Sequence, residues 1–193
     1  MITPALKQIA SGLRFPEGPV AMSDGSVVLV EIERHTLSRV TSDGNVRVIA
    51  NLGGGPNGAA MGPDGKIYVT NNGGLKFMER PGKMFPIAQA DDYTGGLIQI
   101  VDPETGKFET LYDSCDGVKL RGPNDLVFDD AGGFWFTDLG KTRDRDMDRG
   151  AVYYATDAWR VRGGLTKTIA NALSLLVYGI VTMVLMFWAL GTE

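Results

Sequence analysis

The sequence is poor in the side chains that most often serve as nucleophiles, general bases and metal ligands. Its 193 residues include one cysteine, Cys115, and one histidine, His35. A single cysteine cannot form an internal disulfide, which excludes a disulfide-stapled scaffold. A Ser-His-Asp or Cys-His mechanism would have to use His35, and this residue lies between two predicted strands, where we expect a surface position.

Basic charge and an apolar N-terminus are also missing. The chain has 19 Lys and Arg against 23 Asp and Glu, a formal net charge of -4. This balance gives no excess of positive charge that could bind the phosphates of a nucleic acid, so no nucleic-acid partner is expected. Residues 1–7 contain no long apolar segment, so no secretory signal is expected.

What the sequence does contain is a repeat. Three segments align without gaps, namely Glu17–Glu31, Asn57–Asn71 and Asn124–Asp138. Each consists of a polar residue, a short apolar strand, a turn that closes on glycine and a second strand rich in β-branched or aromatic residues. Such a turn between two apolar runs predicts a β-hairpin, because glycine supplies the positive φ that a tight turn needs.

Each repeat is followed by further strands. A second hairpin is predicted at 37–49 and another at 97–111, while a third begins at 150–154. Four strands per unit are typical of a propeller blade. We therefore predict an all-β fold, a partial β-propeller of about three blades, over residues 1–157. The residues from 72 to 94 are predicted to form a long loop.

The C-terminal part differs in composition. Residues 169–190 are uncharged and predominantly apolar, and as a helix they would span roughly 33 Å, enough to cross a membrane. A basic linker is predicted at 158–168. The positive-inside rule then predicts a single-pass membrane protein whose N-terminal body is cytoplasmic. The alternative to a membrane span is a buried core helix. If the apolar tail is an artefact of a shifted reading frame, the protein is expected to be soluble and cytoplasmic.

The repeat also brings three polar residues into one register. Glu17, Asn57 and Asn124 each stand just before an apolar strand, and equivalent inner strands of a propeller converge on its axis. One carboxylate and two amide oxygens are hard ligands that suit Ca²⁺, Mg²⁺, Mn²⁺ or Zn²⁺. The alternative is that the two asparagines only cap turns, and the residues by themselves leave both interpretations open.

Four motifs resemble the first three blade signatures of the SMP-30/gluconolactonase/LRE family. They are Phe15–Pro19, Gly55–Gly58, Gly122–Leu126 and Phe136–Asp138. The resemblance implies a six-bladed propeller that hydrolyses lactones with a divalent metal ion in its channel. It also implies that Glu17 and Asn124 are metal ligands and that Asn57 faces the metal and the substrate.

The resemblance also implies a further aspartate, in later blades, that binds the metal and acts as the base. No residue of this chain corresponds to it, so no catalytic residue is assigned. Asp125 and Asp138 belong to the third repeat and are not substitutes by position, and Asp138 is expected to be structural. The alternating charges of 141–149 predict a solvated loop.

Three functional hypotheses follow. The first is a lactone hydrolase that is incomplete and inactive as this chain alone. In the second, a homodimer or a separate partner half completes the ring on a membrane surface. The third is a non-catalytic, membrane-tethered half-propeller that serves as a binding or assembly module.

Overall fold

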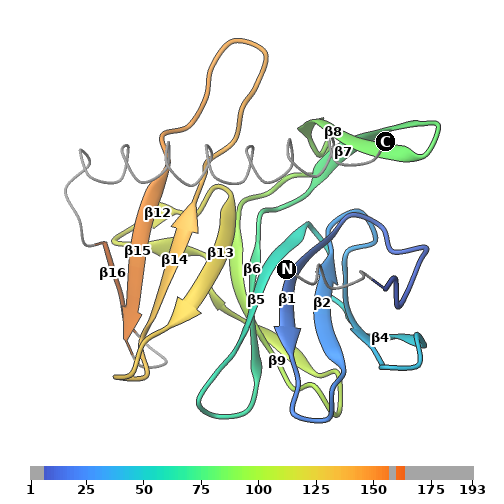
Figure 1. Ribbon diagram of the computed structural model, residues 1–193. Helices are drawn as coiled ribbons and strands as arrows, with labels where there is room; N and C mark the ends of the chain where they lie inside the picture. Colours follow the sequence, from blue (N-terminus) through green and yellow to red (C-terminus); the bar gives the residue numbers. More distant parts are fainter. Residues whose placement is uncertain (1–6, 157–159, 164–193) are drawn as a thin grey trace, which may run out of the picture.

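The computed structural model describes residues 7–156 and 160–163, and this part of the chain consists of β-strands and loops without a helix. The predicted all-β class is therefore confirmed for the described residues. Three four-stranded antiparallel sheets follow one another along the chain (Figure 1). Two short hairpins stand outside these sheets, one inserted between two strands of the second sheet and one between the second and third sheets.

The strands of the three sheets are defined as follows. The first sheet has the order β1-β2-β3-β4, with β1 (Pro16–Ala21), β2 (Val27–Glu31), β3 (Thr36–Val40) and β4 (Val46–Asn51). The second has the order β5-β6-β9-β10, with β5 (Pro56–Met61), β6 (Ile67–Asn71), β9 (Leu97–Val101) and β10 (Phe108–Tyr112). The third has the order β13-β14-β15-β16, with β13 (Pro123–Phe128), β14 (Phe134–Asp138), β15 (Ala151–Thr156) and β16 (Arg160–Gly163).

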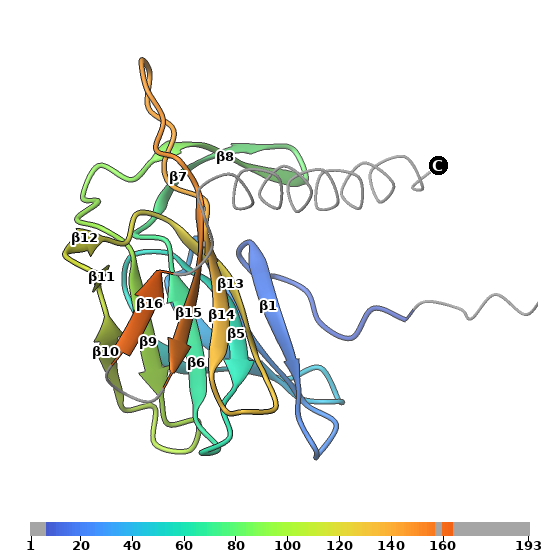
Figure 2. The same ribbon diagram turned by 90° about the vertical axis from the view of Figure 1, so that its left-hand side faces the viewer.

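The first strand of each sheet lies against the first strand of the next. Strand β5 contacts β1 on one side and β13 on the other (Figures 1 and 2). Glycine permits this approach, since a Cβ at Gly18 would lie 2.5 Å from the amide nitrogen of Ala59. A Cβ at Gly58 would lie 2.6 Å from the carbonyl oxygen of Asn124. Both distances are far below van der Waals contact, so these positions require glycine.

The predicted hairpin turns are present in all three repeats. Gly25, Gly65 and Gly132 have φ values of 79°, 77° and 82°, the left-handed conformation that the tight turn requires. In each turn the glycine N–H donates to a backbone carbonyl oxygen three residues earlier, at 3.0, 3.0 and 3.1 Å. The predicted turns that close on glycine are thus confirmed in all three repeats.

Two apolar clusters fill the spaces between neighbouring sheets. One contains side chains from the first and second sheets, including Val30, Leu37 and Val69, each fully buried. The other joins the second and third sheets around Ile98 and Phe136. Because each cluster draws residues from two sheets, no sheet has an apolar core of its own, and packing of sheet on sheet stabilises the fold.

A buried polar residue ends the second strand of every repeat. Asp138 accepts hydrogen bonds from the backbone N–H groups of Arg121, Gly122 and Gly140, at 2.7, 2.7 and 2.8 Å. Asn71 accepts from the N–H of Gly55 at 2.8 Å. Each acceptor therefore fixes the loop that leads into the first strand of its own repeat, and the predicted structural role of Asp138 is confirmed.

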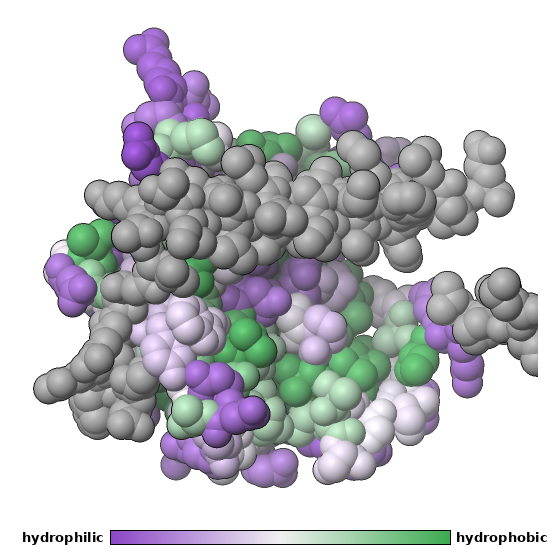
Figure 3. All heavy atoms as spheres, turned by 60° about the vertical axis from the view of Figure 1, so that its left-hand side comes forward, coloured by the Kyte–Doolittle hydropathy of each residue, from purple (hydrophilic) through white to green (hydrophobic). Residues whose placement is uncertain are grey.

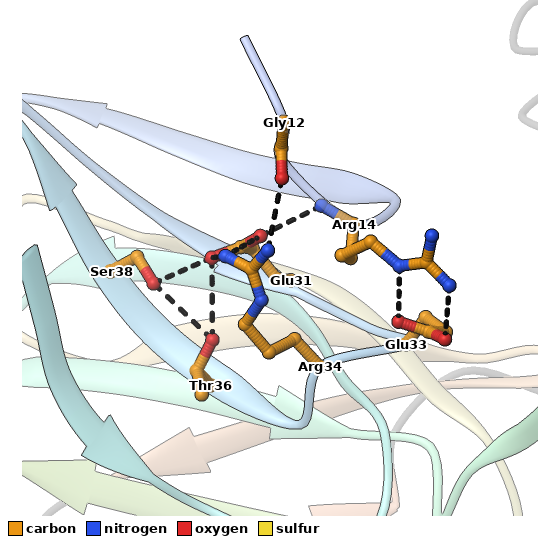
Figure 4. Close-up of polar contacts among 7 residues, drawn as sticks. All are labelled: Gly12, Arg14, Glu31, Glu33, Arg34, Thr36 and Ser38. Carbon is orange, nitrogen blue, oxygen red and sulfur yellow. Dashed lines mark hydrogen bonds and ion pairs between the residues drawn. The ribbon is translucent and has the colours of Figure 1, made fainter. Parts of the chain in front are cut away.

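Glu31 is the equivalent residue of the first repeat and is fully buried. Its carboxylate accepts from the N–H of Arg14 at 2.7 Å, from Ser38 Oγ at 2.8 Å and from the guanidinium of Arg34 (Figure 4). The ion pair with Arg34 and the hydrogen bonds together compensate the burial of the charge.

Some features differ from the sequence prediction or lie outside the described residues. A hairpin of β7 (Leu75–Arg80) and β8 (Lys83–Gln89) occupies the segment predicted as a long loop, and β11 (Ser114–Cys115) pairs with β12 (Val118–Lys119). Strand β16 falls within the range predicted as a basic linker. No helix of the described residues could span a membrane, and the span predicted at 169–190 lies outside them.

Replacement of Asp138 tests this strand-end arrangement. Asp138→Ala would leave three backbone N–H groups without their acceptor, and we expect the free energy of unfolding to fall by about 3 kcal/mol. Chemical denaturation of the full chain in detergent measures the change. Asp130→Ala, at an exposed turn position, is the matched control and should change stability by less than about 0.5 kcal/mol. Equal stability of the two variants would contradict the assigned role.

Candidate functional site

The three residues singled out by the repeat occupy one structural position. Glu17, Asn57 and Asn124 are each the second residue of the first strand of their sheet. In each sheet the pairing register shifts at or beside this residue. A β-bulge of this kind re-aims a side chain locally and is frequent beside functional sites. The three side chains therefore belong to one end of adjacent inner strands.

A direct hydrogen bond joins two of the three. The amide Nδ2 of Asn57 donates to Oδ1 of Asn124 at 3.0 Å. Below it, the hydroxyl of Thr70 accepts from the N–H of Gly58 at 2.8 Å and donates to the carbonyl oxygen of Asn124 at 2.7 Å. These bonds tie the second sheet to the third, and they orient the Asn124 side chain so that its oxygen faces the second sheet.

Glu17 approaches the same place from the first sheet. Its side chain keeps solvent access, yet the surrounding protein desolvates it enough to raise the pKa of its carboxyl, and the negative charge of Asp125 raises this pKa further. Desolvation likewise raises the pKa of Asp125. Two carboxylates thus lie close enough to repel each other across the inner strands.

Asp125 is a residue that sequence reasoning did not include in the site. The available signal was the repeat itself, because Asp125 aligns with Gly18 and Gly58. A carboxylate stands in the third repeat where the other two have glycine. One of its oxygens would lie 2.5 Å from a Cβ at Gly58, so the carboxylate occupies the space that this glycine leaves open.

The donor set fits a hard divalent cation. It consists of the carboxylates of Glu17 and Asp125 and the amide oxygens of Asn57 and Asn124, all of them oxygen ligands. The described residues hold no cluster of three or more His, Cys, Asp or Glu side chains, so a metal ion here would need the amide oxygens. The raised pKa values of both carboxyl groups mark a place where added positive charge would be stabilised.

Lys141 is the one member of the charged 141–149 segment that is not solvated. Its side chain is 6% exposed, and its ammonium donates to Gly74 O at 3.0 Å and to Asn72 Oδ1 at 3.3 Å. The ammonium also lies 5.1 Å from the ring centre of Tyr93. Desolvation lowers its pKa to about 8. Lys141 therefore joins loops of the second and third sheets at the end that carries the site.

The rest of this segment agrees with the prediction of a solvated loop. It projects from the third sheet as a largely hydrophilic extension (Figures 1 and 3). His35 is exposed, as expected, and its Nδ1 contacts the carbonyl oxygen of Gly54. Cys115 is buried. Neither residue lies in the group of oxygen ligands, so the site uses neither imidazole nor thiolate.

Comparison with known proteins agrees with this geometry. The model of the family described as "SMP-30/Gluconolactonase/LRE-like region" matches residues 15–175, which include all three repeats. The chain belongs to this family. This match confirms the resemblance that the four motifs indicated, and it extends that resemblance over residues 15–175.

The chain is similar to a curated protein that is about twice as long. A gluconolactonase of Zymomonas mobilis subsp. mobilis is 25% identical over 197 residues, covering 90% of this chain and 49% of that protein. The chain thus spans about half of the length of this curated relative.

Solved structures share the fold. A gluconolactonase from Xanthomonas campestris superposes with a TM-score of 0.59 at 19% identity, covering 79% of this chain and 48% of that one. An aldose sugar dehydrogenase from Streptomyces coelicolor, with bound PQQ, gives 0.55 at 16% identity, covering 80% and 48%. At these identities the likeness concerns the β-propeller-like arrangement of the sheets alone.

The raised pKa of the Glu17 carboxyl predicts that its contribution to stability falls as the pH rises, the reverse of the usual effect of a carboxyl group. Because the folded state favours the protonated carboxyl, the stability of the metal-free chain should fall as pH rises from about 4.3, the unfolded value, through the raised folded value. Glu17→Gln should therefore be more stable than the wild type at pH 7 and equal to it below about pH 4. Urea unfolding in the presence of a chelator measures this difference.

The exposed Glu109→Gln is the control and should show no such pH dependence. A Glu17→Gln variant less stable than the wild type at pH 7 would show that the carboxylate is stabilising there, and the assigned electrostatics would be wrong.

Proposed function

We propose that this chain provides the metal-binding and substrate-orienting residues of a lactone hydrolase. The observation that carries the proposal is the hydrogen-bonded pair Asn57–Asn124 beside the carboxylates of Glu17 and Asp125, all at one end of three adjacent inner strands. This set is rich in oxygen and negative charge and keeps access to solvent. The gluconolactonase relatives support an ester of the lactone class as substrate.

Glu17 and Asn124 are the proposed metal ligands, and the ion is Ca²⁺, Zn²⁺, Mn²⁺ or Mg²⁺. When bound there, the ion would supply Lewis-acid polarisation of a lactone carbonyl and would acidify a nearby water. Charge decides the role of Glu17, because its carboxylate is the negative ligand contributed by the first sheet. The Asn124 oxygen is neutral and already accepts one hydrogen bond from Asn57, which leaves its second lone pair for the ion.

Asn57 is the proposed substrate-orienting residue. Its Nδ2 is engaged with Asn124, so its Oδ1 is directed elsewhere and can accept a hydrogen bond from a substrate hydroxyl. In the hydrolysis, a water oxygen bonds to the carbonyl carbon, the ring C–O bond breaks, and the ring oxygen takes a proton to give a hydroxy acid. We assign no general base among residues 7–156 and 160–163.

The proposal keeps two expectations from the sequence. A membrane anchor at 169–190 would hold the body on the cytoplasmic side. A second copy of the chain, or a partner half, would close the ring around the inner strands and complete the metal site from the other chain. Activity of the chain would then depend on its concentration.

The test is lactone hydrolysis by the full chain in detergent, after chelation and then with each of the four metal ions. We expect metal-dependent turnover of gluconolactone that rises more steeply than linearly with chain concentration. Glu17→Gln should lower kcat/KM by about a hundredfold or more, because it removes the charged ligand. Glu109→Gln should leave the rate unchanged.

Equal turnover in Glu17→Gln would contradict the assigned site. Absence of turnover with every metal ion, at all chain concentrations, would contradict the lactonase function of this chain and would favour the non-catalytic binding module.

A further inference from the structure

A cavity lies at the segment that leads into β1. It measures about 600 Å³ and lies between the segment that leads into β1 and the tip of the β7–β8 hairpin. This volume falls within the range of about 300–1,000 Å³ that is typical of small-molecule pockets. Phe15, which lines the cavity, precedes Glu17 by two residues, so the cavity lies at the end of β1 that carries the proposed metal ligand.

Positive charge exceeds negative charge in its walls. Arg14, Arg80 and Lys83 line the cavity together with one acidic residue, Glu79. The guanidinium of Arg14 is neutralised, because it forms two hydrogen bonds to Glu33, at 2.8 and 2.6 Å (Figure 4). It also forms an ion pair with Glu79. Among the described residues, Arg80 and Lys83 form no salt bridge.

The two unneutralised cations are cross-strand neighbours. Arg80 and Lys83 pair directly across the turn of the β7–β8 hairpin. Like charges in this position repel each other and destabilise a hairpin. Among the described residues, the ring of Phe85 lies 5.8 Å from the Arg80 guanidinium carbon and offsets part of this repulsion. An anion between the two cations would relieve the repulsion.

The remaining walls are apolar and in part strained. Leu13, Phe15 and Met84 provide apolar surface, and the ring of Phe15 packs on Phe77 with centroids 5.0 Å apart. Phe15 has a φ of 55°, a left-handed conformation that costs a bulky residue of order 1 kcal/mol. Such strain is characteristic of binding sites, and here it presents the aromatic side chain to the cavity.

We propose that this cavity binds the anionic end of the substrate, a phosphate or carboxylate carried by a sugar-sized ring. The anion would lie between Arg80 and Lys83, and the ring would contact Phe15 and extend toward Glu17. This inference rests on the proposed function for the identity of the ring. It adds a preference for charged over neutral sugar lactones.

Binding is tested apart from hydrolysis, with sugars that are not lactones. Calorimetry at low ionic strength compares glucose 6-phosphate, glucuronate and neutral glucose on the full chain in detergent. We expect glucose 6-phosphate to bind more tightly than glucuronate, because it carries the larger charge, and glucose to show no measurable binding. Each of Arg80→Gln and Lys83→Gln should weaken binding of the phosphate about fivefold.

Lys107→Gln, at an exposed turn of the second sheet, is the matched control and should bind as the wild type does. Both hairpin variants should stay folded, since each removes a repulsion, and thermal unfolding verifies this. Equal affinity of the variants and the wild type, or equal affinity for charged and neutral sugars, would overturn the proposal.

The two proposals fail separately. Hydrolysis of gluconolactone without any binding of the anionic sugars would sustain the proposed function and reject the anion pocket. Binding of glucose 6-phosphate that depends on Arg80 and Lys83, without lactone hydrolysis, would sustain the pocket and reject the lactonase.

Discussion

The structure depends on a buried acceptor at the end of the second strand of each repeat. Glu31, Asn71 and Asp138 are between 0 and 4% exposed, and each accepts a backbone N–H from the loop that precedes the inner strand. A buried N–H without a partner costs about 1–3 kcal/mol, so these bonds fix where each inner strand begins. The inner strands in turn carry the residues of the site.

Much of this arrangement was predictable from the sequence, because it repeats. The hairpin turns follow from glycine, and the shared register of Glu17, Asn57 and Asn124 follows from a gapless alignment. The β7–β8 hairpin was not predicted, because it occurs once and its pairing depends on a turn at Pro81–Gly82 rather than on Asp-Gly. Asp125 was set aside because of its position in the third repeat. Lys141 was assigned to a solvated loop, because burial in a contact between sheets is not visible in a local pattern.

Two pairs of like charges form no salt bridge within the described residues. Glu17 and Asp125 repel each other at the inner strands, and Arg80 and Lys83 do so at the hairpin tip. The repulsion within each pair lowers stability. An ion of the opposite charge, bound between the two groups, would relieve it. Stability is thus lower where the proposed cation and the proposed anion would bind, which is the usual relation between stability and function.

The central claim is that the inner strands form one divalent-cation site. A crystal structure of the full chain with Mn²⁺, analysed by anomalous scattering, tests it most directly. The account predicts an anomalous peak bonded to the carboxylate of Glu17 and to Oδ1 of Asn124, within reach of Asn57. A peak elsewhere, or none at these residues at saturating Mn²⁺, would contradict it.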